Sequence, residues 1–292
     1  MTQNQIQHTS KSKLHCEILK LSHRFGLGLH QNNFGPKVFT DYQRFALIVL
    51  FLRSKKALRE FVETLSESRW TSWLGLREIP SKSSLHAWMQ QYTTARPRLL
   101  NEMLLEDETP SLMAIDATGV DSWQRSRHYE RRIGEAYMPY AKLDLLVDTE
   151  KFLIFDHVLR IKPRHDVRGA KTMFQRSKLK NILVLADRGY DSEPLHSVAE
   201  QQKITLYAPV RDFHVKKPRG KHRRRCLKGN TKYSRRNCVE SLIHSFKTTR
   251  VNHLRSKKAH MKKREIAWQI LTYNLIKLSK ACKALLRISQ PA

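Results

Sequence analysis

Apolar side chains recur every three or four residues along the N-terminal third of the chain, which is the period of an amphipathic helix. A first apolar run covers residues 45–52, and Thr40 and Gln43 before it have the types and spacing of a capping box. The same period predicts a second helix over residues 56–65, and a third helix that begins within residues 81–84. We therefore predict a small all-α module over residues 36–104.

The residues before this module are polar, apart from scattered leucines. They predict an arm over residues 1–35 that carries one short helix, at 13–25. The pattern alone does not show whether the helical module binds DNA or serves assembly.

The pattern changes after Pro110, where short apolar runs rich in β-branched residues predict strands. These runs cover residues 112–120, 142–147, 152–159, 182–186 and 204–210. Helical patterns lie at residues 169–179 and 192–202, and an amphipathic helix is expected at 264–286. Three adjacent strands followed by alternating strands and helices predict an α/β domain over residues 105–292, with a mixed sheet flanked by helices.

Charge limits the choice of partner. The 292 residues carry a formal net charge of +29, and a polyanion such as nucleic acid is the usual partner of so basic a chain. A membrane surface is the competing partner, but the run at residues 45–52 is too short to span a bilayer. The first thirty residues are polar and show no signal-peptide pattern, so we expect an intracellular protein without a membrane partner.

The basic residues are concentrated in one interior block. Residues 211–264 contain twenty Lys and Arg but only two acids, Asp212 and Glu240. Such a block is often a disordered tail, but here a predicted strand precedes it and a predicted helix follows it. The candidate DNA-binding residues in it, besides those discussed below, are Lys216, Lys217, Arg223, Arg224 and Arg225.

Two aspartates lie where buried strands end. Asp116 is in or just after the first predicted strand, and Asp187 directly follows the fourth. An acid at such a place has a fixed position and an accessible tip, which suits a metal ligand. The alternative is that each aspartate only caps the turn that follows. We interpret Asp144 and Asp148 as turn or surface acids.

The third acid, Glu240, has the most informative surroundings. On a continuous helix, Tyr233, Arg236, Glu240 and Lys247 fall within an arc of about 60° on one face. The neighbouring arc is apolar, with Val239, Leu242, Ile243 and Phe246. The alternative is a solvated face with an Arg236–Glu240 salt bridge, which contributes only a few tenths of a kcal/mol.

These residues give the chain a family resemblance. It resembles the DDE transposases of bacterial and archaeal insertion sequences, in the group with a Tyr-x2-Arg-x3-Glu-x6-Lys signature, which Tyr233, Arg236, Glu240 and Lys247 match. The segments around Asp116 and Asp187 are also typical, and the resemblance covers about residues 40–285. One departure is that only 52 residues separate Asp187 from Glu240, which leaves no room for the large β-insertion of some relatives.

The resemblance implies an RNase H-like fold in which Asp116, Asp187 and Glu240 hold two Mg²⁺ or Mn²⁺ ions. Two metals about 3.5–4 Å apart would neutralise the attacking and leaving oxygens of a phosphodiester. Arg236 and Lys247 would grip phosphates, and Tyr233 would bond a phosphate or stack on a base. The implied partner is double-stranded DNA, both element ends and target, bound by a homodimer in the cytoplasm at the nucleoid.

Three other functions compete with an active transposase. A decayed or co-opted transposase would bind DNA without cutting it, but all three acids are intact. An RNA-binding protein would have aromatic residues throughout the basic block, where only Phe213, Tyr233 and Phe246 occur. A nuclease or resolvase of the same fold would cleave without joining strands. In the helical module, Lys82 and Gln90 are candidates for DNA contacts on the third helix, which could instead pack on the catalytic domain.

Overall fold

The computed structural model describes residues 10–28, 30, 38–120, 140–162, 165–211, 218–251 and 253–288. The chain forms two compact units. The first comprises the chain up to Glu106 together with the chain from Ala267 onward, and the second is Asp107–Ile266. The first boundary between the units thus falls between Glu106 and Asp107. The last part of the C-terminal helix, however, groups with the N-terminal helices instead of the sheet domain.

The first unit is helical. Its helices are α1 (Ser10–Arg24), α2 (Asp41–Ser54), α3 (Leu58–Ser66), α4 (Trp70–Trp73), α5 (Lys82–Gln91), α6 (Ala95–Leu104) and the later part of α12 (Ala259–Ile288). The predicted capping box is confirmed, since Thr40 and Gln43 exchange side-chain and backbone hydrogen bonds at the start of α2. The short helix α4 and helix α6, which has Pro97 in its first turn, were not predicted.

Helix α2 forms the centre of this unit. Its residues Phe45–Leu52 are all buried, so it is apolar on every side instead of on one stripe. Trp268 of α12 packs against Phe45 of α2, with the ring centroids 5.9 Å apart. Leu14, Ile18 and Leu21 of α1 are also buried. The described part of the predicted polar arm is therefore a packed helix of this unit.

Helix α5 shows which of its faces is available to a partner. Ser81 caps its N-terminus by accepting a hydrogen bond from the Ser84 N–H. Lys82 and Gln90 are exposed, whereas Leu85 and Trp88 are buried. Trp88 packs on Phe39 with the ring centroids 5.0 Å apart, so this apolar face is used within the helical unit itself.

The second unit is built on a five-stranded mixed sheet in the order β3-β2-β1-β4-β5, which confirms the predicted α/β, RNase H-like class. Its strands are β1 (Leu112–Val120), β2 (Ala141–Asp148), β3 (Ile154–Arg160), β4 (Ile182–Leu185) and β5 (Ile204–Tyr207). The first three strands pair antiparallel, whereas β1, β4 and β5 are parallel. The central strand β1 therefore joins the two halves of the sheet.

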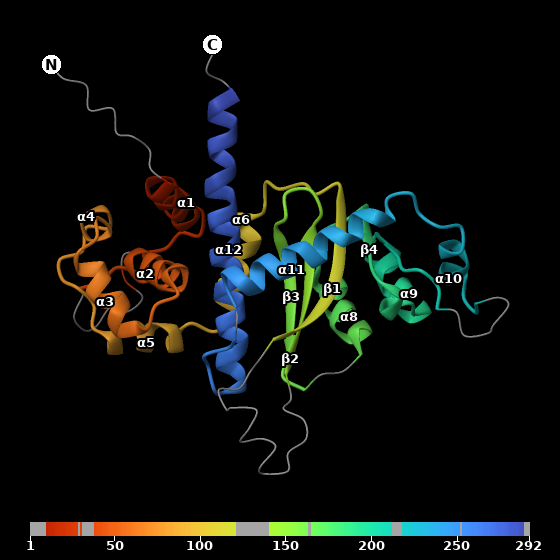
Figure 1. Cartoon of the computed structure of the whole chain (residues 1–292), viewed down its shortest axis with the longest axis horizontal. Coiled ribbons are helices and arrows are strands. Elements are labelled where there is room, and N and C mark those ends of the chain that lie inside the picture. The colour runs from red at the N-terminus through yellow and green to blue at the C-terminus, as the bar shows by residue number, and fades with distance from the viewer. Residues whose placement is uncertain are drawn as a thin grey trace, which may run out of the picture. The chain divides into compact units, whose positions relative to one another are not determined.

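Helices cover both faces of this sheet, and Figure 1 shows α11 (Asn237–Thr249) running across the first three strands. Met113 and Ile115 of β1 share a buried core with residues of α8 (Asp166–Arg176) and α9 (Glu193–Gln201). Because side chains alternate along a strand, Asp116 and Thr118 face the opposite side, where they line a cavity with residues of α11. The buried residues of α11 are Val239, Leu242, Ile243 and Phe246, as predicted.

Asp148 lies at a turn, as predicted, whereas Asp144 differs from the prediction that it lies at a turn or on the surface. Asp148 is 2% exposed, although its carboxylate does accept a turn hydrogen bond, from the Glu150 N–H. Asp144 is fully buried and accepts two hydrogen bonds from Arg160, at 2.8 and 2.5 Å. A Cβ atom at Gly169 of α8 would overlap the Asp144 carboxylate, so this position requires glycine. The sequence pattern does not show that Asp144 is buried, because its partner Arg160 comes from the next strand.

Because Asp144 and Arg160 form a buried ion pair, we predict that the effect of removing Arg160 on the free energy of unfolding depends on pH. Burial raises the pKa of Asp144 to about 6, although Arg160 opposes this. The Arg160→Met variant should lose about 3–5 kcal/mol of unfolding free energy near pH 7, because a buried carboxylate loses its counter-ion. Without Arg160 the folded-state pKa of Asp144 rises further, so the loss should grow as the pH rises above 6 and should shrink as the pH falls through 6, where Asp144 is protonated in both folded proteins.

Urea denaturation at a series of pH values measures this effect. Lys151→Ala is the matched control, because the Lys151–Glu108 pair is in the same unit and Lys151 is 59% exposed. That variant should lose less than about 1 kcal/mol. A cost for Arg160→Met that is equally small, or that does not change with pH, would contradict the assigned role of this pair.

Candidate active site

The register of β1 and β4 brings two of the predicted acids together. Ala114 pairs with Leu185 in this parallel pair, and Asp116 and Asp187 each follow two residues later. The two aspartates therefore stand at equivalent positions on adjacent strands. Asp187 also accepts a 2.8 Å hydrogen bond from the Gly189 N–H in the 3₁₀ turn η1 (Arg188–Tyr190), so it caps a turn as well.

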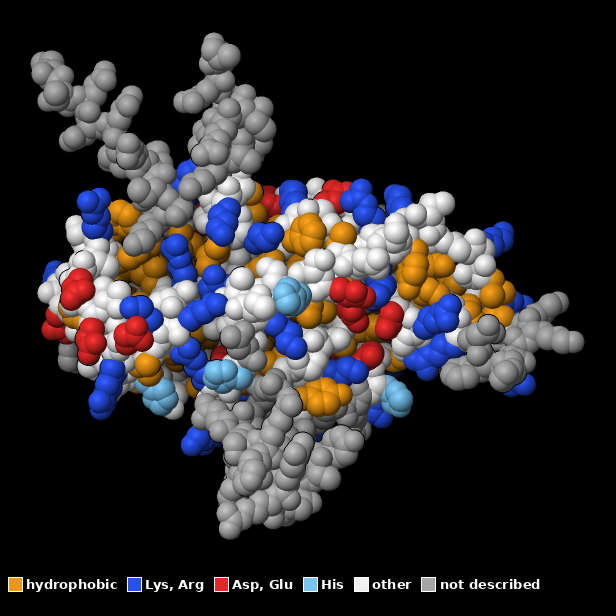
Figure 2. Space-filling view, viewed as in Figure 1, with side chains coloured by type: hydrophobic (Ala, Val, Ile, Leu, Met, Phe, Trp, Pro, Cys, Tyr) orange, Lys and Arg blue, Asp and Glu red, His pale blue; other side chains and the backbone are white. Residues whose placement is uncertain are grey.

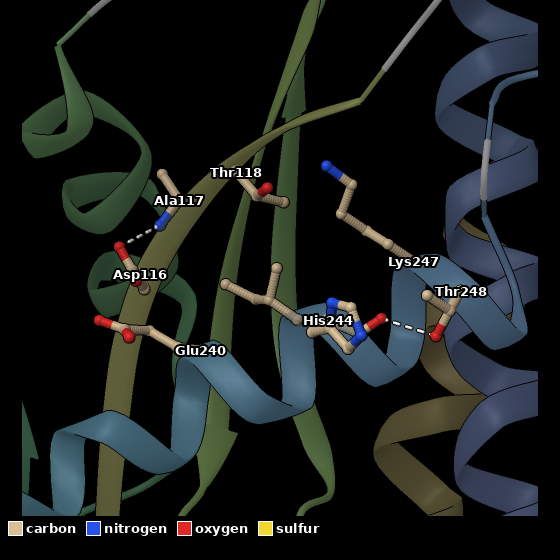
Figure 3. Close-up of a pocket in the computed structure, with 8 residues that line it drawn as sticks. Asp116, Ala117, Thr118, Glu240, His244, Lys247 and Thr248 are labelled. Carbon is tan, nitrogen blue, oxygen red and sulfur yellow. Dashed lines mark hydrogen bonds between the residues drawn. The ribbon is translucent and has the colours of Figure 1, made fainter.

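Glu240 approaches the same place from α11. It lines a cavity of about 500 Å³ with Asp116, and Lys247 of α11 lines the cavity too. Figure 3 shows the carboxylates of Asp116 and Glu240 close together, with Lys247 reaching toward β1 from farther along the helix. The Lys247 ammonium group donates a 2.9 Å hydrogen bond to the Gly119 carbonyl of β1. This contact fixes the C-terminal half of α11 against the strand that carries Asp116.

A guanidinium lies between two of the acids. Arg236 is 3.4 Å from an Asp116 carboxylate oxygen through Nη1 and 2.5 Å from a Glu240 oxygen through Nη2. Burial raises the pKa of Asp116, and the charges of Asp187 and Glu240 raise it further, while the Ala117 N–H and Arg236 oppose the shift. Burial lowers the pKa of Arg236, but Asp116 and Glu240 outweigh this and raise it. The three predicted acids thus share one electrostatic environment.

The donor set is suited to a hard divalent cation, although the arrangement is not that of a bound metal. Three carboxylates supply oxygen ligands of the kind that Mg²⁺ and Mn²⁺ prefer. Among the residues that the structure describes, no three His, Cys, Asp or Glu side chains are close enough to hold a metal ion. The Arg236 guanidinium stands in for a cation between Asp116 and Glu240. The chemistry of the three carboxylates thus suits such an ion, while two of them now contact Arg236.

The prediction that the signature residues lie on one continuous helix is wrong. Tyr233 and Arg236 are the first and last residues of a 3₁₀ turn, η2 (Tyr233–Arg236), and α11 begins only at Asn237. Arg236 and Glu240 still meet, because residues four apart at a helix start remain neighbours. The Tyr233 ring packs edge-on against Tyr207, with the centroids 5.5 Å apart. Tyr233 thus anchors η2 to the last residue of β5.

The basic block contains a structured helix that was not predicted, α10 (Lys221–Cys226). Arg223 donates two 2.7 Å hydrogen bonds to Asp191, whose side chain is fully buried. The Glu193 carboxylate accepts hydrogen bonds from the His222 and Arg223 N–H groups at the start of α10. Three predicted DNA-binding residues thus differ in their surroundings, because Arg223 faces inward while Arg224 and Arg225 are exposed. Lys216 and Lys217 lie outside the described residues.

Sequence reasoning missed the acids that dock α10 and one further residue of the cavity. His244 lines the cavity with Asp116 and Glu240. Its spacing, four residues after Glu240 and three before Lys247, could have placed it on the same helix face.

On the face drawn in Figure 2, a small group of acidic side chains lies among Lys and Arg side chains. Nothing local in the sequence marks Asp191 and Glu193 as partners of a helix some thirty residues later.

Comparison with known families decides the assignment. The model of the transposase DDE domain matches residues 107–275, which is more than half of the chain. The chain belongs to this transposase family. It is accordingly a DDE transposase, a metal-dependent phosphoryl transferase that acts in DNA cleavage and strand transfer. No curated protein matches the chain. No helix in the described part of this transposase is long and apolar enough to cross a membrane.

Two solved structures are similar to this transposase over most of its length. A piggyBac transposase synaptic complex with hairpin DNA covers 93% of this chain and 74% of its own, at 11% identity and a TM-score of 0.48. A pre-cleavage Mos1 transpososome covers 96% of this chain and 88% of its own, at 10% identity and a TM-score of 0.24. The assignment rests on the family match and on the five-stranded sheet, not on these scores.

The docking of α10 predicts that neighbouring arginines behave differently. Arg223→Ala should speed amide exchange in α10 and lower stability by about 1–3 kcal/mol, because a buried carboxylate loses a charged hydrogen-bond partner. Arg224→Ala, an exposed neighbour in the same helix, should change neither quantity measurably. Hydrogen–deuterium exchange of the peptide that contains α10 measures this. Equal protection in the two variants would show that Asp191 does not hold the helix.

Proposed function

We propose that this protein is an insertion-sequence transposase that cuts the ends of its element and joins them to a target. Asp116, Asp187 and Glu240 are its catalytic acids. The observation that carries the proposal is the convergence of these three residues. They are far apart in the sequence, yet Asp187 and Glu240 are close enough to Asp116 to raise its pKa. The cavity beside Asp116 and Glu240 lies on the α11 side of the sheet. Both acidic and basic side chains line it.

The acids would hold two divalent ions, Mg²⁺ or Mn²⁺. When bound, these ions neutralise charge on the attacking and leaving oxygens of a phosphodiester. Asp116 lies on the paired strand β1 and Asp187 follows its neighbour β4, while a helix packed on the same sheet carries Glu240, which supports their role as ligands. Lys247 neutralises a phosphate as a point charge, whereas Arg236 can bind one through two N–H groups.

The DNA surface extends from the acids to α10. Arg224 and Arg225 are exposed there, and the docking of α10 onto α9 gives them a fixed position. Double-stranded DNA is the substrate that this surface fits. An element has two ends, so we expect two copies of the chain in the DNA complex. The exposed Lys82 and Gln90 of α5 are suited to a further contact with the element end.

Replacing each acid by its amide tests the proposed chemistry. Asp116→Asn, Asp187→Asn and Glu240→Gln should each lower cleavage by at least a thousandfold and leave binding to element ends within about threefold, because affinity comes from phosphate contacts. Cleavage and strand joining are followed with labelled element ends and Mg²⁺ or Mn²⁺.

Asp156→Asn is the matched control, because Asp156 lies on β3 of the same sheet and pairs with Arg176. It should cleave as the wild type does. A catalytic-site variant that keeps a tenth of wild-type cleavage would remove that acid from the site. Cleavage without any strand joining would indicate a nuclease.

The salt dependence of DNA binding tests the proposed surface. Each phosphate contact releases about 0.9 of a counter-ion, so the logarithm of the affinity should fall steeply with the logarithm of the salt concentration. Arg224→Ala and Arg225→Ala should each reduce the slope by about one contact. Fluorescence anisotropy with a labelled duplex measures the slopes. Slopes unchanged by both variants would place the DNA elsewhere.

A further inference from the structure

We propose that Arg236 is the resting counter-ion of the active site, and that divalent-metal binding requires its guanidinium to leave Asp116 and Glu240 for a DNA phosphate. Arg236 would thus couple metal binding to DNA binding. This inference rests on the proposed function, because it concerns the same acids. It adds a second role to a residue whose proposed part in catalysis is only to grip a phosphate.

The geometry shows a competition for the same oxygens. Arg236 uses one terminal nitrogen for Asp116 and the other for Glu240, so a single side chain joins two of the three acids. A carboxylate oxygen that accepts a guanidinium hydrogen bond is less available as a metal ligand. A divalent cation at the same oxygens would also be repelled by the adjacent positive charge. The guanidinium and the metal are therefore alternative occupants of the site.

The same contacts show that the guanidinium can leave. Its distance to Asp116, 3.4 Å, is long for a charge-assisted hydrogen bond, which is commonly about 2.7–2.9 Å. Its closer partner, Glu240, has a side chain that is 59% exposed, and ion pairs with exposed groups contribute little. Lys247, in contrast, is bonded to the Gly119 carbonyl and leaves the acids to Arg236. Arg236 itself is 15% exposed, and its hold on the acids depends on the one close contact, with Glu240.

A phosphate is the chemical partner that would draw Arg236 away. The planar guanidinium fork matches two phosphate oxygens as well as it matches carboxylates. DNA that enters the cavity beside Asp116 and Glu240 brings phosphates within the same positively charged surroundings. Once Arg236 binds a phosphate, both acids are free for metal. Because linkage is reciprocal, DNA raises metal affinity and metal raises DNA affinity by the same factor.

Calorimetric titration of Mn²⁺ into the full-length, DNA-free protein tests the competition. Arg236→Gln should bind Mn²⁺ at least about fivefold tighter than the wild type, the lower end of ordinary coupling between sites. Arg235→Gln is the matched control, because it removes the same charge from an exposed neighbour in the same 3₁₀ turn. It should leave the Mn²⁺ affinity within about twofold of the wild type.

A second titration, with a short duplex of random sequence present, tests the coupling. The duplex should tighten Mn²⁺ binding to the wild type, after subtraction of Mn²⁺ binding to DNA alone, and should tighten binding to Arg236→Gln much less. Thermal unfolding in EDTA shows whether Arg236→Gln is folded. If it is not, Arg236→Lys replaces it, with an intermediate gain expected because an ammonium group cannot bridge both acids.

Equal or weaker Mn²⁺ binding by the folded Arg236 variant would overturn the inference, as would an equal gain in Arg235→Gln. Either result, together with cleavage by the wild type that is lost in Asp116→Asn, leaves the proposed function intact. Absence of both Mn²⁺ binding and cleavage in the wild type would overturn the proposed function itself.

Discussion

The pairing of β1 with a neighbour on each side is the constraint on which the rest of this unit depends. Its antiparallel pairing with β2 and its parallel pairing with β4 fix the alternation of its side chains. Ile115 must then enter the core under α8 and α9, and Asp116 must face α11. A slip of one residue would bury the acid and expose the isoleucine. The same register sets Asp187 beside Asp116, so the hydrophobic core and the site geometry are specified by one set of hydrogen bonds.

Placing acids side by side in a half-buried site is unfavourable unless positive charge is near. Burial and the two other acids raise the pKa of Asp116, and Arg236 is the closest group that opposes them. The protein therefore stabilises the clustered acids before any metal is bound. This explains why an arginine follows the signature tyrosine at a spacing that lets it reach both the strand and the helix. One arginine of the basic block around Glu240 thus stabilises the acid cluster.

The sequence was sufficient to predict the sheet, because each strand is a short apolar run. Of the two aspartates, Asp187 follows such a run, whereas Asp116 lies within β1. It also predicted the apolar face of α11, which depends only on local periodicity. It failed where the outcome depends on residues distant in the chain. Asp144 lies within β2 and looks like an ordinary polar residue of a strand until Arg160 is brought beside it, and α10 is too short to have a clear period. The division of α12 between two units likewise depends on packing partners that periodicity does not specify.

Part of the positive charge is structural, and arginines that pair with carboxylates are already cancelled in the net charge of +29. Arg160, Arg176 and Arg223 each bind a carboxylate of the sheet domain. These pairs tie β2 to β3, β3 to α8, and α10 to the chain just after Asp187. The acids Asp191 and Glu193 turn part of a basic segment, which would otherwise repel itself, into a docked helix. Only after that docking do Arg224 and Arg225 have a defined direction, so the position of these exposed arginines depends on Asp191 and Glu193.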